Sequence, residues 1–136
     1  MNIKPQFIII CREAFLQAGN NNLNLIGIFT QLNADKLPFI FPRFSVVVNF
    51  DIDVAGEHLV HTDIIDPSGK QIAHAELPVR TTEGNWQVIA NFEQMQFATY
   101  GMYSFVLSLD GVSLGTRALE LKPMLSPVTG RKPSIA

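Results

Sequence analysis

Apolar and polar residues alternate along most of this 136-residue chain, and a period of two is typical of β-strands. The clearest case is segment 44–53, whose even positions are all apolar and whose odd positions, apart from Val47, are polar. We expect a half-exposed antiparallel strand there, with its even side chains buried. Similar runs predict further strands at residues 6–15, 23–32, 58–65, 70–79, 86–92, 102–109 and 112–121.

Two turns join these strands into hairpins. Asp110-Gly111 separates two apolar runs, and both residue types accept the positive φ that a tight hairpin turn needs. The sequence Asp66-Pro67-Ser68-Gly69 combines a local acceptor, a fixed φ and a left-handed position. It therefore predicts that 58–65 and 70–79 pair.

Two glycines mark irregular places within predicted strands. Gly27 indicates a bulge or a close approach of backbone inside 23–32. In the last strand, Leu114 differs in parity from Leu119 and Leu121, and a bulge near Gly115 would reconcile them. The alternative is a short helix over 117–122, which the sequence favours by composition but which is too short before Pro123 to be convincing.

About seven or eight short strands, with turns every ten residues or so, predict an all-β fold: an antiparallel β-sandwich, Ig-like or similar. We expect one sandwich domain over residues 1–122 and a C-terminal tail over 123–136, which contains two prolines and a glycine beyond Pro123. A tyrosine corner is a structural role open to Tyr100 or Tyr103, just before the last hairpin.

Residues 33–42 form the longest irregular segment, because Pro38 and Pro42 oppose a regular ladder or helix. The segment folds over one end of the core, or it presents an exposed apolar patch to a partner. In the second case the interface residues are Leu37, Phe39, Ile40 and Phe41.

Charge and cysteine content narrow the class of partner. The net charge of −2 gives no reason to bind nucleic acid or an acidic membrane. Charged residues make up 16% of the chain, against about 25% in typical domains, which favours a covered face.

The single cysteine, Cys11, excludes a disulfide within the chain and indicates a cytoplasmic protein. Beside three isoleucines it is expected to act as a small buried hydrophobe. The apolar run at 7–10 is too short for a membrane span or a signal peptide.

No catalytic set emerges from the motifs. Residues 111–115 match the G-x-S-x-G pattern of hydrolases, but the first glycine belongs to a hairpin turn and no histidine follows Ser113. Phosphate-cradling and dinucleotide-binding glycine loops do not occur. We therefore expect no enzyme activity, no catalytic residues and no cofactor.

Three histidines, His58, His61 and His74, lie on the hairpin 58–79 and are ligands that zinc accepts. A three-residue loop would place Thr62 opposite His74, which sends His61 and His74 to opposite faces. A slip of one residue would bring them together. On the predicted register they are ordinary exposed strand histidines, and no metal ligands are assigned.

A set of short motifs is spread along the chain: Cys11-Arg12-Glu13, Leu23 to Phe29, Phe41-Pro42, Phe44 to Val48, Asp66 to Gly69, Gly101 to Phe105 and Asp110-Gly111. In these motifs the sequence resembles a family of small, uncharacterised, mostly bacterial proteins. The likeness covers nearly the whole chain up to about Lys122 and implies a cytoplasmic all-β domain with no assigned activity.

Low charge and the apolar segment at 37–41 lead to one main functional hypothesis: a non-enzymatic interaction or assembly module that associates with itself or with another protein. One alternative is a small-molecule-binding sandwich with the Trp86 or Phe92 face lining a pocket. A second is a metal-dependent enzyme that uses the His58–His74 hairpin.

Overall fold

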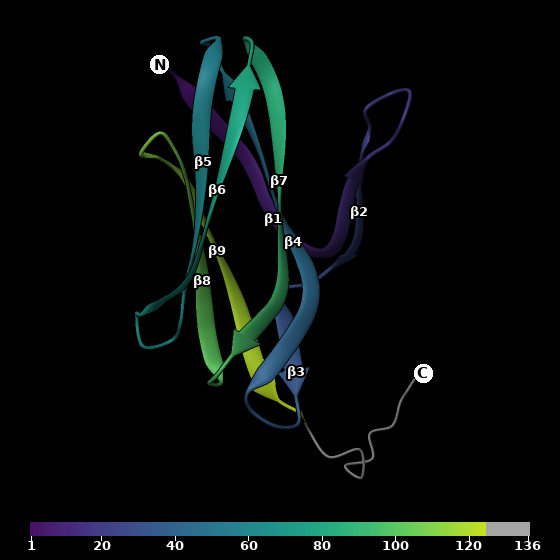
Figure 1. Cartoon of the computed structure of the whole chain (residues 1–136), viewed down its shortest axis with the longest axis vertical. Coiled ribbons are helices and arrows are strands. Elements are labelled where there is room, and N and C mark those ends of the chain that lie inside the picture. Colours follow the sequence, from purple (N-terminus) through teal and green to yellow (C-terminus); the bar gives the residue numbers. More distant parts are fainter. Residues whose placement is uncertain (125–136) are drawn as a thin grey trace.

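The computed structural model describes residues 1–124, in which the chain forms nine strands (Figure 1). Within this range there is no helix, and hence none able to cross a membrane. The strands are β1 (Ile3–Leu16), β2 (Leu23–Ile28), β3 (Gln31–Ala34), β4 (Phe39–Ile52), β5 (Gly56–Ile65), β6 (Gln71–Thr81), β7 (Gly84–Phe97), β8 (Gly101–Leu109) and β9 (Val112–Pro123).

The strands form two facing sheets, which confirms the predicted all-β, antiparallel sandwich. Sheet A has the order β2-β1-β4-β7, and sheet B has the order β3-β9-β8-β5-β6. One pairing departs from the antiparallel pattern, because β3 runs parallel to β9, from Gln31 opposite Glu120 to Ala34 opposite Pro123. The last strand is therefore held between β3 and β8 inside sheet B.

The core lies between the sheets and is centred on Phe44 of β4. The even residues of β4 from Phe44 to Ile52 are all buried, as the alternation predicts. The Phe44 ring stacks on Phe92, with centroids 5.2 Å apart, and meets Phe105 of sheet B edge-on at 6.0 Å. Aromatic contacts thus join the two sheets at the middle of the sandwich.

The outer face of β4 corrects the prediction of a half-exposed strand, since Ser45, Val47 and Asn49 are also buried. Both flanks of Val47 are apolar, because Ile9 and Ile89 are its partners in the ladders. The polar side chains on either side of Val47 form hydrogen bonds with the neighbouring strand β7. Ser45 Oγ donates to Asn91 Oδ1 at 2.6 Å, and Asn49 Nδ2 donates to Gln87 Oε1 at 3.0 Å. Cross-strand pairing makes these burials tolerable.

The predicted strand 23–32 is wrong as a single element. Its first part, β2, pairs with β1 in sheet A, whereas Gln31 already belongs to β3 in sheet B. The chain changes sheets at Phe29 and Thr30. The predicted close approach at Gly27 is confirmed, because its φ is +70° and a Cβ there would lie 3.0 Å from Arg12 Cγ.

The segment 33–42 is also more regular than predicted. Strand β4 already starts at Phe39, so Pro42 lies inside a strand rather than in a loop. In the ladder with β7, Phe41 lies opposite Met95 and Arg43 lies opposite Glu93. Gln94, between Glu93 and Met95, has a φ of +54°. Pro42 therefore lies opposite a residue of β7 with left-handed backbone.

Both predicted hairpin turns are confirmed. Asp110 and Gly111 have φ values of +49° and +83°. Asp66 Oδ1 accepts from the backbone N–H groups of Ser68 and Lys70, each at 2.9 Å. These bonds favour the ionised carboxylate and lower the pKa of Asp66, with the Ser68 hydroxyl the largest cause.

The last strand is confirmed as a strand with a bulge. Leu107 faces Gly115 and Ser108 faces Ser113, so Leu114 is the extra residue, and it is buried together with Leu119 and Leu121. Strand β9 runs to Pro123, and residues 125–136 of the predicted tail lie outside the described residues.

Both tyrosines before the last hairpin bind backbone. The buried Tyr103 hydroxyl donates to the Thr99 carbonyl at 2.7 Å, which is a local corner of the predicted kind. The Tyr100 hydroxyl donates to the carbonyl of Ala34, at the end of β3, at 3.0 Å. The start of β8 is thereby fixed to the strand on the far side of β9.

Candidate functional site

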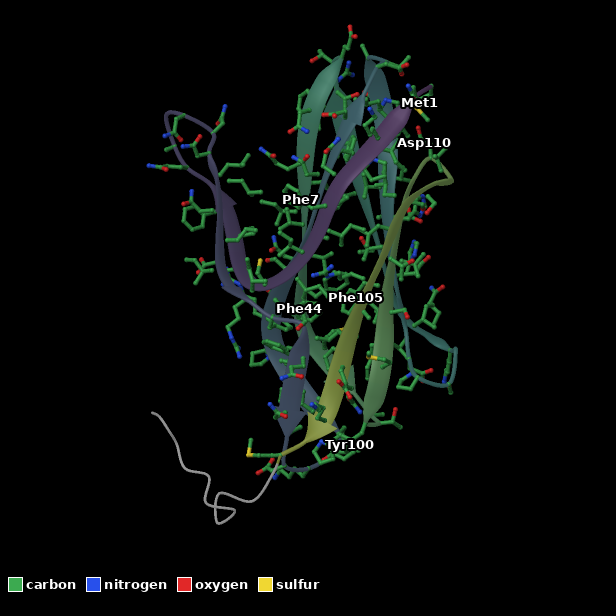
Figure 2. The ribbon with its side chains drawn as sticks, turned by 180° about the vertical axis from the view of Figure 1, so that it is seen from behind. Met1, Phe7, Phe44, Tyr100, Phe105 and Asp110 are labelled. Carbon is green, nitrogen blue, oxygen red and sulfur yellow. The ribbon has the colours of Figure 1, made fainter. Side chains whose placement is uncertain are left out.

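The most distinctive surface feature is a two-stranded projection that we call the hairpin arm, residues 12–28. It consists of the second half of β1 and the whole of β2, paired from Glu13↔Ile26 to Leu16↔Leu23. In Figure 1 the arm lies on the opposite side of sheet A from β5, β6, β8 and β9. Figure 2 shows it from behind, standing away from the part of β1 that carries Phe7.

The arm exposes large apolar side chains. Phe15, Leu16, Ile26 and Ile28 are 42%, 46%, 51% and 57% exposed. By strand parity, Phe15, Ile26 and Ile28 belong to one face of the arm and Leu16 to the other. Both faces are therefore apolar in part. A two-stranded ribbon that buries so little is only marginally stable in water by itself.

Strand β2 is also an edge of sheet A, so one side of its backbone is unpaired in the ladder. Edge strands usually carry charge, proline or a short length, any of which discourages pairing with another chain. In β2, read LNLIGI, there is no charged residue and no proline. By contrast, edge strand β3 has only four residues, and edge strand β6 contains Pro78.

The base of the arm is anchored to the sandwich. The Arg12 guanidinium lies over the rings of Phe41 and Phe29, with its carbon 5.2 Å and 5.8 Å from the ring centroids. A weak, exposed ion pair joins Glu13 to Arg43 at 3.9 Å. The arm is therefore fixed at its root, while its apolar residues beyond Glu13 remain accessible.

The structure divides the interface residues that the sequence predicts. Phe41 is only 3% exposed, and Phe39 packs against the core with its ring 5.9 Å from that of Phe41. The assignment of Phe41 to an exposed patch is wrong, because its ring is buried at the start of β4. Phe39 is half-buried, and its place in an interface stays a prediction. Leu37 and Ile40 are 36% and 49% exposed, and an interface at these two stays a prediction.

The predicted register of the histidine hairpin is wrong by one residue. His61 lies opposite Glu76 and Asp63 lies opposite His74, with a register shift between Ile64 and Ile65. His61 and His74 therefore share the outer face of sheet B, and their rings are 5.4 Å apart. We call His61, Asp63, His74 and Glu76 the histidine–carboxylate cluster.

Hydrogen bonds organise this cluster around His74. Its Nδ1 bonds Asp63 Oδ1, its Nε2 lies 2.8 Å from Glu76 Oε2, and His61 Nδ1 lies 3.7 Å from the same oxygen. The two carboxylates stabilise the imidazolium, so the pKa of His74 is raised, first by Asp63 and then by Glu76. The bond from His74 also lowers the pKa of Glu76.

His58 is separate from the cluster, as strand parity predicts, but the expectation that it is an exposed strand histidine is wrong. Its side chain is buried on the inner side of sheet B, and its Nδ1 lies 2.7 Å from Asp110 Oδ2. Asp110 Oδ1 also accepts from the Leu59 N–H at 2.8 Å. The His58 hydrogen bond is the main cause that lowers the pKa of Asp110.

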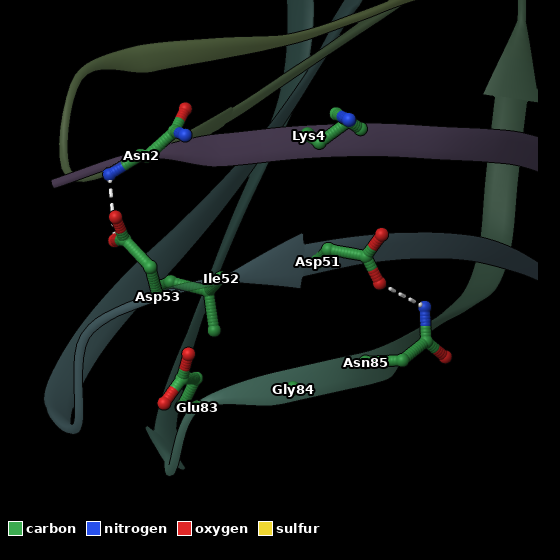
Figure 3. A pocket seen from close by; sticks show the side chains of 8 residues that line it. All are labelled: Asn2, Lys4, Asp51, Ile52, Asp53, Glu83, Gly84 and Asn85. Atoms are coloured by element: carbon green, nitrogen blue, oxygen red, sulfur yellow. Dashed lines mark hydrogen bonds between the residues drawn. The ribbon is translucent and has the colours of Figure 1, made fainter.

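A shallow hollow of about 320 Å³ lies at the end of sheet A, where β4 ends and β7 begins (Figure 3). Two of its carboxylates, those of Asp51 and Asp53, accept hydrogen bonds from the chain itself. Asp53 Oδ1 accepts from the Asn2 backbone N–H at 2.7 Å, and Asp51 accepts from the amides of Asn85 and Gln6 at 2.8 Å. We assign no ligand to this hollow.

The remaining candidates have structural positions. Phe92 packs in the core against Phe44, and the Trp86 indole N–H donates to the Thr82 carbonyl at 2.8 Å. A ligand pocket on that face stays a prediction. Cys11 is fully buried, as expected, and burial raises the pKa of its thiol.

Comparisons with known proteins identify a family but no activity. The model of the Family of unknown function (DUF6941) matches residues 6–122. Among curated proteins, no sequence matches this chain.

Solved structures are similar in fold alone. The DNA glycosylase AlkC of Pseudomonas fluorescens, bound to DNA with an abasic site analogue, is 11% identical, with a TM-score of 0.54 over 88% of this chain and 30% of that one. The C-terminal domain of wzt is 10% identical, with a TM-score of 0.52 over 90% and 75%. An immunoglobulin-like protein of Pseudomonas aeruginosa is 12% identical, with a TM-score of 0.44 over 90% and 98%. The chain thus spans under a third of the glycosylase.

Proposed function

Because this chain belongs to the Family of unknown function (DUF6941), which carries no assigned activity, we propose a function from its geometry: a non-enzymatic assembly module that self-associates through the hairpin arm. The observation that carries the proposal is the exposure of Phe15, Leu16, Ile26 and Ile28 on an arm that projects from the sandwich. Single exposed apolar side chains are ordinary on a protein surface, whereas four on one short ribbon mark an interaction surface.

The partner we propose is a second copy of the chain. Two β2 edges can pair antiparallel about a two-fold axis, because such an axis brings the same strand of each copy together in opposite directions. The uncharged sequence of β2 offers no repulsion to this pairing. Ile26 and Ile28 of each copy would then lie near those of the other, and the two A sheets would become one continuous sheet.

A bacterial, cytoplasmic setting is part of the proposal. The cytoplasmic part is supported by the buried, unpaired thiol of Cys11, which suits a reducing compartment. The proposal assigns no enzymatic reaction to the chain. The fold likeness to a DNA glycosylase does not argue otherwise, since unrelated functions share this type of sandwich.

The test is the mass of the protein in solution, measured by light scattering across a range of concentrations. We expect the natural chain to be a dimer. The dimer of Ile28→Lys should dissociate already at concentrations at least about tenfold higher than those at which the natural dimer dissociates, since a buried, unpaired charge opposes pairing. Met102→Lys is the matched control, because Met102 is 55% exposed on β8 and Ile28 is 57% exposed. A monomer at every concentration would contradict self-association.

A second substitution separates the two possible interfaces. Ile40→Lys places the same charge on a side chain that is 49% exposed but lies outside the arm. If Ile40→Lys dissociates the dimer and Ile28→Lys does not, the interface lies at the start of β4 and the arm proposal is wrong. The reverse result supports the arm.

A further inference from the structure

The histidine–carboxylate cluster and the arm belong to different sheets: the cluster lies on the outer face of sheet B, and the arm is part of sheet A. Strand β5 supplies His61 and Asp63, and edge strand β6 supplies His74 and Glu76. Their side chains are between 27% and 49% exposed, so solvent and dissolved ions can reach them. What this cluster binds is independent of how the arm associates.

The arrangement around His74 favours a cation. A neutral imidazole has one N–H and one lone pair, so it can donate to Asp63 or to Glu76 but not to both. If Nδ1 donates to Asp63, the Nε2 lone pair faces a Glu76 oxygen 2.8 Å away, and two acceptors then oppose each other. Either a second proton or a metal ion removes this conflict.

Three donor atoms converge where such an ion would bind. One ligand atom each from His61, His74 and Glu76 lies within 4.8 Å of the other two. Ligands of a tetrahedral zinc ion with bonds of 2.0–2.1 Å are about 3.3 Å apart, so modest rotations of exposed side chains would close the site. Two imidazoles and one carboxylate suit zinc and its neighbours, whereas Mg²⁺ and Ca²⁺ prefer oxygen ligands alone.

We propose that His61, His74 and Glu76 bind a divalent transition-metal ion, with zinc as the type case. Asp63 acts as a positioning residue: it accepts the Nδ1–H of His74, holds the ring and leaves Nε2 free for the metal. The ion would join β5 to the edge strand β6 on the outside of sheet B. Water would complete its coordination.

The test uses the untagged full-length chain, freed of metal with a chelator and titrated with Zn²⁺ by calorimetry. We expect one ion per chain, and an affinity at least about tenfold lower for His74→Ala and for Glu76→Gln, which remove ligands. Asp63→Asn should weaken binding by about 10- to 100-fold while the stoichiometry stays at one, as for other partners of metal-bound histidines. Glu57→Gln is the control, since Glu57 is a carboxylate of β5 paired with Arg80 outside the cluster.

A second measurement needs no variant and is therefore independent of folding defects. Imidazole ¹H–¹⁵N spectra of the natural chain should show Zn²⁺ shifting the signals of His61 and His74 but not that of the buried His58. Replacement of Zn²⁺ by Co²⁺ should give the visible absorption of a tetrahedral site. The proposal is overturned if millimolar Zn²⁺ leaves these signals unchanged, or if His74→Ala and Glu57→Gln bind equally well.

Discussion

His58 Nδ1 and Asp110 Oδ2 lie 2.7 Å apart and join the β8–β9 turn to the inner side of β5. The same turn makes two backbone links to Leu59: Asp110 Oδ1 accepts from its N–H at 2.8 Å, and the Asp110 N–H donates to its carbonyl at 3.0 Å. One aspartate thus serves both the tight turn and the attachment of the terminal hairpin. Three bonds at one residue make it a sensitive point for stability.

Asp110→Asn should destabilise the protein by about 1 kcal/mol at pH 7, since a charge-assisted bond to His58 becomes a neutral one at a partly exposed site. Asparagine accepts the positive φ of this turn, so the backbone is expected to persist. Unfolding by urea measures the difference. Equal midpoints for the two proteins would contradict the importance of the charge.

The contribution of Asp110 should also depend on pH. Its pKa is lower in the folded state than the unfolded value of about 3.9, so the unfolded chain takes up a proton first as the pH falls. The stabilisation is therefore complete above that value and is lost as the pH falls through the folded pKa. We expect the gap between the natural protein and Asp110→Asn to shrink below about pH 4, in urea titrations at a series of pH values.

Tyr103→Phe should cost about 1 to 2 kcal/mol of unfolding free energy, because it leaves the Thr99 carbonyl without its buried hydroxyl donor. Tyr100→Phe is the matched comparison. It also removes a bond to a carbonyl, that of Ala34, but at a more exposed position, so its cost should be smaller. Thermal or urea unfolding of both variants provides the measurement, and the opposite order would contradict the argument from burial.

Phe44→Ala should cost about 3 to 5 kcal/mol, since the ring is fully buried and contacts aromatic side chains of both sheets. That loss is a large share of the stability of an ordinary domain. Phe7→Ala, at a side chain 36% exposed on β1, should cost much less. Urea unfolding distinguishes them, and similar losses at the two positions would mean that Phe44 is not the centre of the core.

Cys11 should react slowly with thiol reagents in the folded protein. The side chain is fully buried, and loss of solvation raises the pKa of the thiol, which lowers the amount of reactive thiolate. We expect labelling to become at least about tenfold faster in denaturing urea. Rapid labelling without denaturant would show that the outer face of sheet A opens readily.

The sequence predicts the fold well wherever one face of a strand differs from the other. The even residues of β4 alternate with polar ones and are all buried, and the Asp110-Gly111 turn has the φ values that its residue types favour. Alternation fails on the outer side of β4, because Val47 is covered by apolar neighbours on two other strands. That cover depends on which strands are adjacent, and periodicity does not specify it.

The candidate sites depend on features that periodicity does not determine. The histidine–carboxylate cluster forms because of a shift between Ile64 and Ile65, two identical residues that carry no signal for the position of a bulge. A predicted register with four loop residues instead of three would have placed His61 opposite Glu76 and so indicated the cluster. The arm was not predicted for a different reason. Apolar and polar residues alternate over 23–32 as in a single strand, although the chain leaves sheet A after Ile28.

The parallel pairing of β3 with β9 bears on the order in which the protein folds. It joins residues 31–34 to residues 120–123, so sheet B cannot be completed until nearly all of the described chain has left the ribosome. Contacts so distant in sequence slow folding, because a long loop must close before they form. Until then β3 has no neighbour and β8 has an open edge. The nascent chain therefore passes through a stage with exposed strand edges, in which encounters with other nascent chains lead to aggregation.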